Sequence, residues 1–334
     1  MEMQTRSLVM LTVAAVLAAT IGTTFDASGA QSEPNAGPAD YDVDRPMTLA
    51  PLNGIDIAYT TVGDPDAPPV LMIMGLTASH RLWGGDIVNR LVDAGYLVVL
   101  FDNRDTGESS FLDELGEPTI WWQMLKNAIG FDVDAPYTLH DMAADGIAVL
   151  DVLDIDRAHI VGASMGGMIA QVIATEYPDR TTTLVSIMST TGAPHLPPAE
   201  DDAGQELLDL GGSEGDAAAQ LRELGIHPES MPRQLMAIVQ AGDRTDAVKT
   251  ITAPTLVLHG ADDPLLPPPH GEHTAQTIGG AHLIIYPGMG HNLPPAVLPK
   301  LVGDMVAHFA STEPSRPRGP DEAASTGGAA SAAQ

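Results

Sequence analysis

Residues 159–174 read His-Ile-Val-Gly-Ala-Ser-Met-Gly-Gly-Met-Ile-Ala-Gln-Val-Ile-Ala. A β-branched, apolar run leads into Ser164, and a helix-like run leads out of it. In this strand–turn–helix context the turn strains the backbone of the serine and lifts its hydroxyl clear of the sheet. The flanking residues Gly162 and Gly166 fit this turn, because side chains there would collide with the neighbouring strand and helix. The stretch predicts a nucleophilic serine. Such a short motif also arises by chance, so its context and its downstream partners must support it.

Short apolar runs alternate with helical patterns on both sides of this motif. Strands are expected at 47–52, 55–62, 70–74, 96–101, 159–163, 184–188, 254–259 and 283–286. Helices are expected at 79–94, 139–153, 165–177, 270–278 and 295–309. This alternation predicts an α/β fold with a mainly parallel sheet and helices on both faces. The Asn53-Gly54 turn between the first two strands predicts an antiparallel hairpin at one edge.

Residues 191–248 break the alternation. Prolines, acidic clusters and Gly211-Gly212 surround two short helical stretches at 217–224 and 232–241. An insertion at this point lies over the carboxyl ends of the strands, where open α/β sheets bind their ligands. We therefore expect these residues to form a cap over the site.

A serine nucleophile needs a histidine base, and a carboxylate to orient that base. On this fold the three follow in the order Ser, acid, His. The sequence supplies an acid at Asp262 or Asp263 after one strand, and His291 in a glycine-flanked loop after the next. Spacing favours Asp263, with Asp262 as the alternative. The other histidines are expected elsewhere: in a strand core (His282), at a strand end (His259), in the last helix (His308), on a surface helix (His270, His273) and in the cap (His195, His227).

At this point the chain, from about 47 to 309, resembles the α/β-hydrolase family. Residues 73–76 (Ile-Met-Gly-Leu), 102–109 (Asp-Asn-Arg-Asp-Thr-Gly-Glu-Ser) and 287–291 (Pro-Gly-Met-Gly-His) are similar to the branch that includes aclacinomycin methylesterase. The resemblance implies Ser164 as nucleophile, Asp263 as acid and His291 as base, with an acyl-enzyme intermediate that water hydrolyses. It also implies an oxyanion hole made by the backbone N–H groups of Leu76 and Met165.

The chain departs from the family pattern before Leu76, where many relatives carry His-Gly and this chain carries Met74-Gly75. The turn at 102–109 resembles one that braces the oxyanion loop, so Arg104 and Asp105 are expected in structural ion pairs rather than in contact with substrate. Trp121 and Trp122 are expected to pack in the core or the cap, with an aromatic acyl-binding wall as the alternative.

The sequence patterns at the two ends of the chain differ from the strand–helix alternation of the centre. Arg6 precedes an apolar run at 8–21 and small residues at 28–30, which predicts a signal peptide at 1–30 and a secreted or periplasmic protein. An uncleaved membrane anchor is the alternative. Residues 31–46 are expected to be a linker, 47–311 the folded domain and 312–334 a disordered tail.

The amino-acid composition limits the partners and cofactors that the protein is expected to use. The 334 residues carry a net charge of −29, which excludes nucleic acid as a partner. Cysteine is absent, and no metal, nucleotide or flavin motif occurs, so no cofactor is expected. The sequence predicts an exported serine hydrolase that cleaves small-molecule carboxylic esters, with no stable membrane span once the signal is removed. Hydrolysis of amides, lactones or C–C bonds, or perhydrolysis, by the same triad is the alternative, and a non-catalytic binding protein is a third reading.

Overall fold

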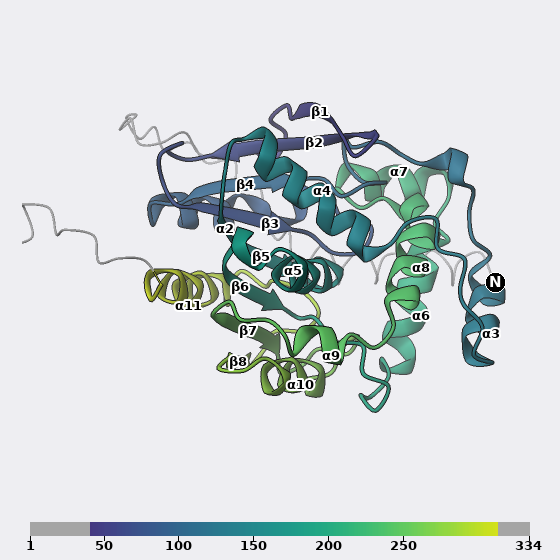
Figure 1. The fold of residues 1–334 in the computed structure, drawn as a ribbon. Helices are drawn as coiled ribbons and strands as arrows, with labels where there is room; N and C mark the ends of the chain where they lie inside the picture. The colour runs from purple at the N-terminus through teal and green to yellow at the C-terminus, as the bar shows by residue number, and fades with distance from the viewer. Residues whose placement is uncertain (1–40, 313–334) are drawn as a thin grey trace, which may run out of the picture.

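The computed structural model describes residues 41–312, and these form an eight-stranded sheet in the order β1-β2-β4-β3-β5-β6-β7-β8 (Figure 1). The strands are β1 (Thr48–Leu52), β2 (Ile55–Val62), β3 (Pro69–Ile73), β4 (Leu97–Phe101), β5 (Ala158–Ala163), β6 (Thr181–Ile187), β7 (Thr255–Gly260) and β8 (His282–Tyr286). The pairs β1–β2 and β2–β4 are antiparallel, and all other pairs are parallel. The predicted signal peptide at 1–30, linker residues 31–40 and the tail from 313 lie outside the described residues.

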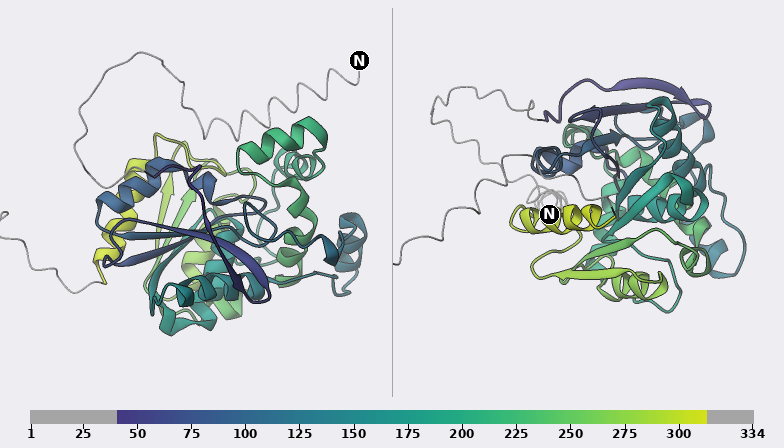
Figure 2. Two further views of the ribbon diagram at one scale, coloured as in Figure 1. Left: turned by 90° about the horizontal axis from the view of Figure 1, so that it is seen from above. Right: turned by 60° about the vertical axis from the view of Figure 1, so that its left-hand side comes forward.

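Helices cover both faces of this sheet. They are α2 (Gly84–Asp93), α3 (Ile120–Ala128), α4 (Leu139–Val152), α5 (Met165–Glu176), α6 (Asp201–Gly211), α7 (Gly215–Glu223), α8 (Met231–Ala241), α9 (Thr245–Val248), α10 (Pro269–Thr277) and α11 (Leu298–Ala310). Helices α2 and α11 pack together over one face, and α4 and α5 over the other (Figures 1 and 2). The central strands β4 and β5 are buried along their whole length, as expected for a sheet covered on both sides.

The predicted α/β architecture is confirmed. The antiparallel hairpin turns at Asn53 and Gly54, whose φ angles of 51° and 84° are the left-handed conformations that a tight two-residue hairpin turn requires. The parallel strands and the helices after them lie within a few residues of the expected positions.

The structure differs from the prediction in several places. Helices α3, α6 and α9 are not among the expected ones, and the predicted helix at 79–94 begins as a 3₁₀ turn at His80–Trp83 before α2. Tyr41 is 5% exposed, packs into the core and donates its backbone N–H to Asn89 Oδ1 at 2.8 Å. Within the described residues the packed part of the chain therefore includes residue 41, which lies in the range expected to be a linker.

One histidine is part of the core of the sheet. His159 on β5 stacks on Phe309 with ring centroids 4.3 Å apart, and its Nδ1 lies 2.9 Å from Thr183 Oγ1. Burial, with a smaller contribution from His308, lowers the pKa of His159 from 6.5 to about 4. The folded protein therefore keeps this ring neutral at pH values where an unfolded chain protonates it.

This burial predicts a loss of stability in acid. Between pH 6.5 and about 4 the unfolded state binds a proton that the folded state does not, so the free energy of unfolding falls as the pH falls through this window. A His159→Phe variant should lose less of its unfolding free energy between pH 7 and pH 5 than the parent, by about 2 kcal/mol. Urea unfolding at the two pH values measures this difference, with the exposed His282→Gln as the control. An equal fall in the parent and in His159→Phe would contradict the prediction.

Across residues 41–312, no helix has the length and apolar character needed to cross a bilayer.

Candidate active site

Ser164 lies on the sharp turn between β5 and α5. Its φ and ψ angles are 56° and −121°, an uncommon conformation for a residue with a side chain, and its N–H donates to Ile187 O at 2.9 Å. The two flanking glycines have the predicted role. A Cβ atom at Gly162 would meet the carbonyl of Gly166, and one at Gly166 would meet the carbonyl of Ile73 on β3. The turn is therefore built so that the serine hydroxyl stands at the carboxyl end of the sheet.

The structure brings the three predicted side chains into one hydrogen-bonded chain. His291 Nε2 lies 2.9 Å from Ser164 Oγ, and His291 Nδ1 lies 2.8 Å from Asp263 Oδ2. In the matching tautomer, the Nδ1–H donates to the carboxylate and Nε2 accepts from the serine hydroxyl. Asp263 is buried, while the histidine side chain is 17% exposed. This is the geometry that proton transfer from a serine to an imidazole requires.

Neighbouring groups fix the orientation of Asp263. Its Oδ1 accepts from the N–H groups of Leu265 and Leu266 at 3.0 and 2.9 Å. His259 Nε2 lies 3.7 Å from Asp263 Oδ2 and 2.7 Å from Leu266 O. Burial lowers the pKa of His259, so this ring is neutral near pH 7 and donates to the carbonyl. The carboxylate is therefore held on both sides, with Oδ2 directed at His291.

The alternative acid, Asp262, lies elsewhere. Its side chain is exposed, and Oδ2 accepts from Gly288 N at 2.8 Å. This bond ties the end of β7 to the loop that carries His291.

These contacts predict different outcomes for the two aspartates. Asp263→Asn should lower kcat by about a thousandfold or more, because an amide does not hold the imidazole in the tautomer that accepts the serine proton. Asp262→Asn should cost far less, since it removes only one exposed contact to the loop. Steady-state kinetics on an activated ester measure both effects. A larger loss from Asp262→Asn than from Asp263→Asn would overturn this assignment.

The two predicted oxyanion donors lie on either side of the serine. Met165 is the first residue of α5, directly after Ser164. The loop that carries Leu76 touches the serine, because a Cβ atom at Gly75 would lie 3.1 Å from Ser164 Cβ. Within the described residues, neither the Leu76 nor the Met165 N–H donates to a protein acceptor. Both groups are available to bind an oxygen that gains negative charge.

The cap holds this loop in place. Thr77, with a φ of 63°, donates its N–H to Gln234 Oε1 at 2.7 Å and accepts from His227 N at 2.7 Å. Gln234 is fully buried and donates its Nε2 to Arg104 O at 3.0 Å. On the other side, Asn103 Nδ2 donates to Met74 O at 2.9 Å. Gln234 positions the loop that carries Leu76, the predicted oxyanion donor, and sequence reasoning missed it because the contact joins residues 157 positions apart.

The turn at 102–109 makes ion pairs, as expected. Arg104 binds Asp145 through Nε and Nη2 at 2.8 and 2.9 Å. Asp105 accepts from Nε and Nη2 of the fully buried Arg233 on α8, both at 2.9 Å, and from the Tyr137 hydroxyl at 2.6 Å. The bonds of Arg233 connect α8 to the turn at 102–109. The same turn contacts the loop that carries Leu76 through the Asn103–Met74 bond.

The remaining histidines lie outside the triad, though two of them differ from their expected settings. His282 is exposed at the edge strand rather than packed in the core. His270 is buried rather than on the surface, with Nδ1 2.7 Å from Thr190 Oγ1 and Nε2 2.9 Å from Pro197 O. Among residues 41–312 no group of three or more histidines or carboxylates is arranged to hold a metal ion.

This fold and this site define a class of protein. A family model described as "alpha/beta hydrolase fold" matches residues 68–226, and one described as "TAP-like protein" matches residues 237–310. The chain belongs to the α/β-hydrolase family. Within this family, the chain is 30% identical over 293 residues to rhodomycin D methylesterase DauP of Streptomyces sp. (strain C5). The alignment covers 74% of this chain and 92% of that protein.

Two further comparisons agree with this placement. Rhodomycin D methylesterase DnrP of Streptomyces peucetius is 29% identical over 293 residues, with the same coverage of 74% and 92%. The crystal structure of the enol-lactonase from Burkholderia xenovorans LB400 superposes with a TM-score of 0.62 at 19% identity, covering 79% of this chain and 100% of that one. The similarity to the enol-lactonase is a similarity of fold alone.

Proposed function

We propose that the protein is an exported serine hydrolase that cleaves small-molecule carboxylic esters through Ser164, His291 and Asp263. The methylesterase relatives support a carboxylic ester hydrolase. The single observation that supports the mechanism is the continuous chain of hydrogen bonds from Asp263 through His291 to Ser164.

The proposed reaction has two halves. Ser164 Oγ attacks the ester carbonyl carbon while His291 Nε2 takes its proton, and the Leu76 and Met165 N–H groups bind the resulting oxyanion. The C–O bond to the alcohol then breaks, and His291 returns the proton to the departing oxygen. In the second half His291 takes a proton from water, the hydroxide attacks the acyl-enzyme, and Ser164 leaves with the proton restored.

Export rests on the sequence pattern at 1–30, with Arg6 before an apolar run. The protein is then secreted or held in the periplasm. Fractionation of producing cells, with the N-terminal residue of the extracellular or periplasmic form determined by mass spectrometry, tests this part of the proposal. Recovery of the intact chain from the cytoplasm alone would contradict it.

The chemistry is tested on the purified protein with p-nitrophenyl esters of increasing acyl length, beside anilide and lactone substrates. We expect ester hydrolysis, and covalent labelling by a fluorophosphonate. A protein that neither labels nor cleaves any ester is not a serine esterase. Faster turnover of lactones than of esters would instead favour lactone hydrolysis by the same three residues.

A further inference from the structure

Helix α3 presents its apolar side chains to solvent. Seven of the ten large apolar side chains that are exposed within the described residues fall between 115 and 131. We call six of them the α3 patch: Trp121, Trp122, Met124, Leu125, Ile129 and Phe131. Trp121 is 68% exposed, Phe131 64% and Ile129 63%. An exposed apolar surface of this kind marks a binding surface rather than a solvated helix face.

Two polar side chains of the helix, Gln123 and Lys126, bond to Asp134 and fix this orientation. Gln123 is 5% exposed, and its amide exchanges two hydrogen bonds of 3.0 Å with the side chain and backbone of Asp134. Lys126 Nζ also binds Asp134 Oδ2 at 3.0 Å. Rotating the helix to bury the tryptophans would break these three bonds. The arrangement differs from an ordinary surface helix, whose apolar side faces the protein, because the one buried residue of α3 is the polar Gln123.

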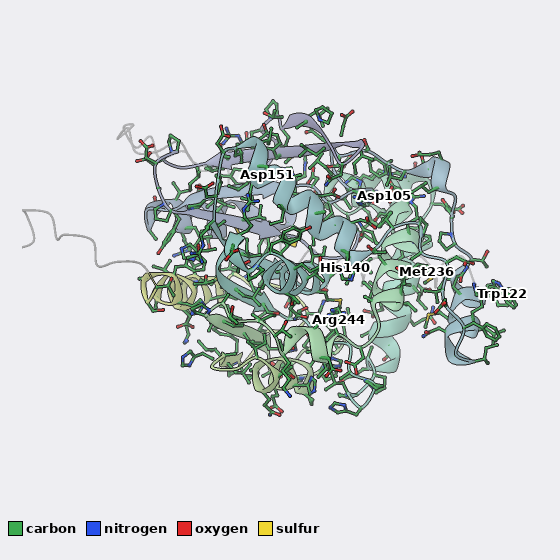
Figure 3. The ribbon with its side chains drawn as sticks, in the orientation of Figure 1. Asp105, Trp122, His140, Asp151, Met236 and Arg244 are labelled. Atoms are coloured by element: carbon green, nitrogen blue, oxygen red, sulfur yellow. The ribbon has the colours of Figure 1, made fainter. Side chains whose placement is uncertain are left out.

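The α3 patch lies at the end of the molecule that carries the cap. Helix α3 packs against α8, and both views place it outside the cap helices (Figures 1 and 2). Trp122 stands at the outer edge of the molecule, with Met236 of α8 between it and the sheet (Figure 3). The patch and the carboxyl ends of the strands therefore share one end of the protein.

The charge around the patch restricts its partner. Residues 118–131 contain no aspartate or glutamate in a chain that has 44 of them, and their only charged side chain is Lys126. Acidic residues flank the segment on both sides at Asp113, Glu114, Glu117 and Asp132. An anionic surface would be repelled by this border.

The size of the patch argues against a second copy of the chain. A stable protein interface uses roughly 20–30 residues on each side, whereas α3 is a nine-residue helix about 14 Å long. Two copies with a net charge of −29 each also repel one another. A few tryptophan, phenylalanine and aliphatic side chains are instead sufficient for the headgroup region of a bilayer, which indole rings favour.

We propose that the α3 patch docks the protein on the surface of a zwitterionic phospholipid bilayer. Docking directs the cap end of the molecule toward the lipid, so the substrates are apolar esters that partition into the bilayer. This substrate class rests on the proposed function; the docking does not.

The tryptophan fluorescence of the chain can report contact between the α3 patch and lipid. The three tryptophans of the chain are Trp121 and Trp122 in the patch and Trp83, which is 3% exposed in the core. Adding phosphatidylcholine vesicles to the full chain should shift the emission to the blue, and bromine-labelled phosphatidylcholine should quench it. Ile129→Gln combined with Phe131→Gln keeps both probes and should raise the lipid concentration for half-maximal quenching by about tenfold or more. Leu49→Gln, which changes an apolar side chain 54% exposed on β1, is the matched control and should leave it unchanged.

Each result of these experiments either supports or overturns docking of the α3 patch on lipid. Weaker quenching when half of the lipid is anionic phosphatidylserine supports the role of the acidic border. Absence of quenching, or equal quenching in the parent and the double variant, overturns the proposal. A blue shift that depends on protein concentration without lipid, with a doubled mass in light scattering, would assign the patch to a second copy. Hydrolysis of a water-soluble short ester should be unchanged in the double variant; its absence in the parent would refute the esterase while leaving the lipid result intact.

Discussion

Ser164→Ala should abolish fluorophosphonate labelling and lower kcat for an activated ester by about ten-thousandfold or more. The hydroxyl is the group that His291 Nε2 faces at 2.9 Å, and alanine leaves the turn without a nucleophile. The domain should remain folded, because the strained turn is held by the backbone bond to Ile187 and by the close-packed glycines. Active-site labelling with steady-state kinetics measures the effect, and circular dichroism checks the fold.

A second serine provides the control. Ser79 Oγ is buried and has no hydrogen-bond partner within the described residues, so Ser79→Ala should label and turn over like the parent. His291→Ala should be as damaging as Ser164→Ala, and the double variant no worse than either, because the two groups act as a unit. Losses that multiply in the double variant would show that the residues act independently and would contradict the triad.

Arg233→Met should lower the free energy of unfolding by about 3–5 kcal/mol. The guanidinium is fully buried and makes two bonds to Asp105, which is itself buried. Removing the cation leaves the carboxylate without its counter-ion in the interior, where an unpaired charge is costly. The urea midpoint, with m-values compared, measures the loss.

Two comparisons separate the buried charge from the lost side chain. Asp105→Asn combined with Arg233→Met should be less destabilised than the sum of the single variants, since neither charge then remains unpaired. Arg222→Met removes an exposed pair with Glu229, with side chains 47% and 26% exposed, and should cost less than about 1 kcal/mol. If Arg222→Met and Arg233→Met lowered the free energy of unfolding equally, burial would not be the reason that the Arg233–Asp105 ion pair stabilises the fold.

The parts of the fold that could be predicted from sequence are those fixed by local patterns. Strands β3 to β8 carry apolar runs, and the glycines beside Ser164 mark the turn. Helix α6 escaped prediction because its sequence is acidic and glycine-containing, so its small apolar side does not stand out. Helix α3 escaped because its tryptophans suggested packing, and the structure shows that the expected packing of Trp121 and Trp122 is wrong.

The candidate triad could be proposed from chain order, but its supports could not. Gln234 and Arg233 lie in the cap, and nothing local in that helix indicates that they contact Thr77 and Asp105. The settings of His282 and His270 were also wrong, because burial depends on which strand ends the sheet and on how the loop at 190–197 folds back. Contacts between residues more than a hundred positions apart come from tertiary packing.

The link between the oxyanion loop and the cap also fixes an order of events during synthesis. Residues 77–79 bond to 225–227 through Ala78–Ile226 pairing and two flanking backbone bonds, so the partner of the loop leaves the ribosome about 150 residues after it. A growing chain that already holds Ser164 still lacks the cap residues that bond to the loop after β3, and His291 is made later still. The residues of the candidate site can therefore come together only after residue 291 has been made.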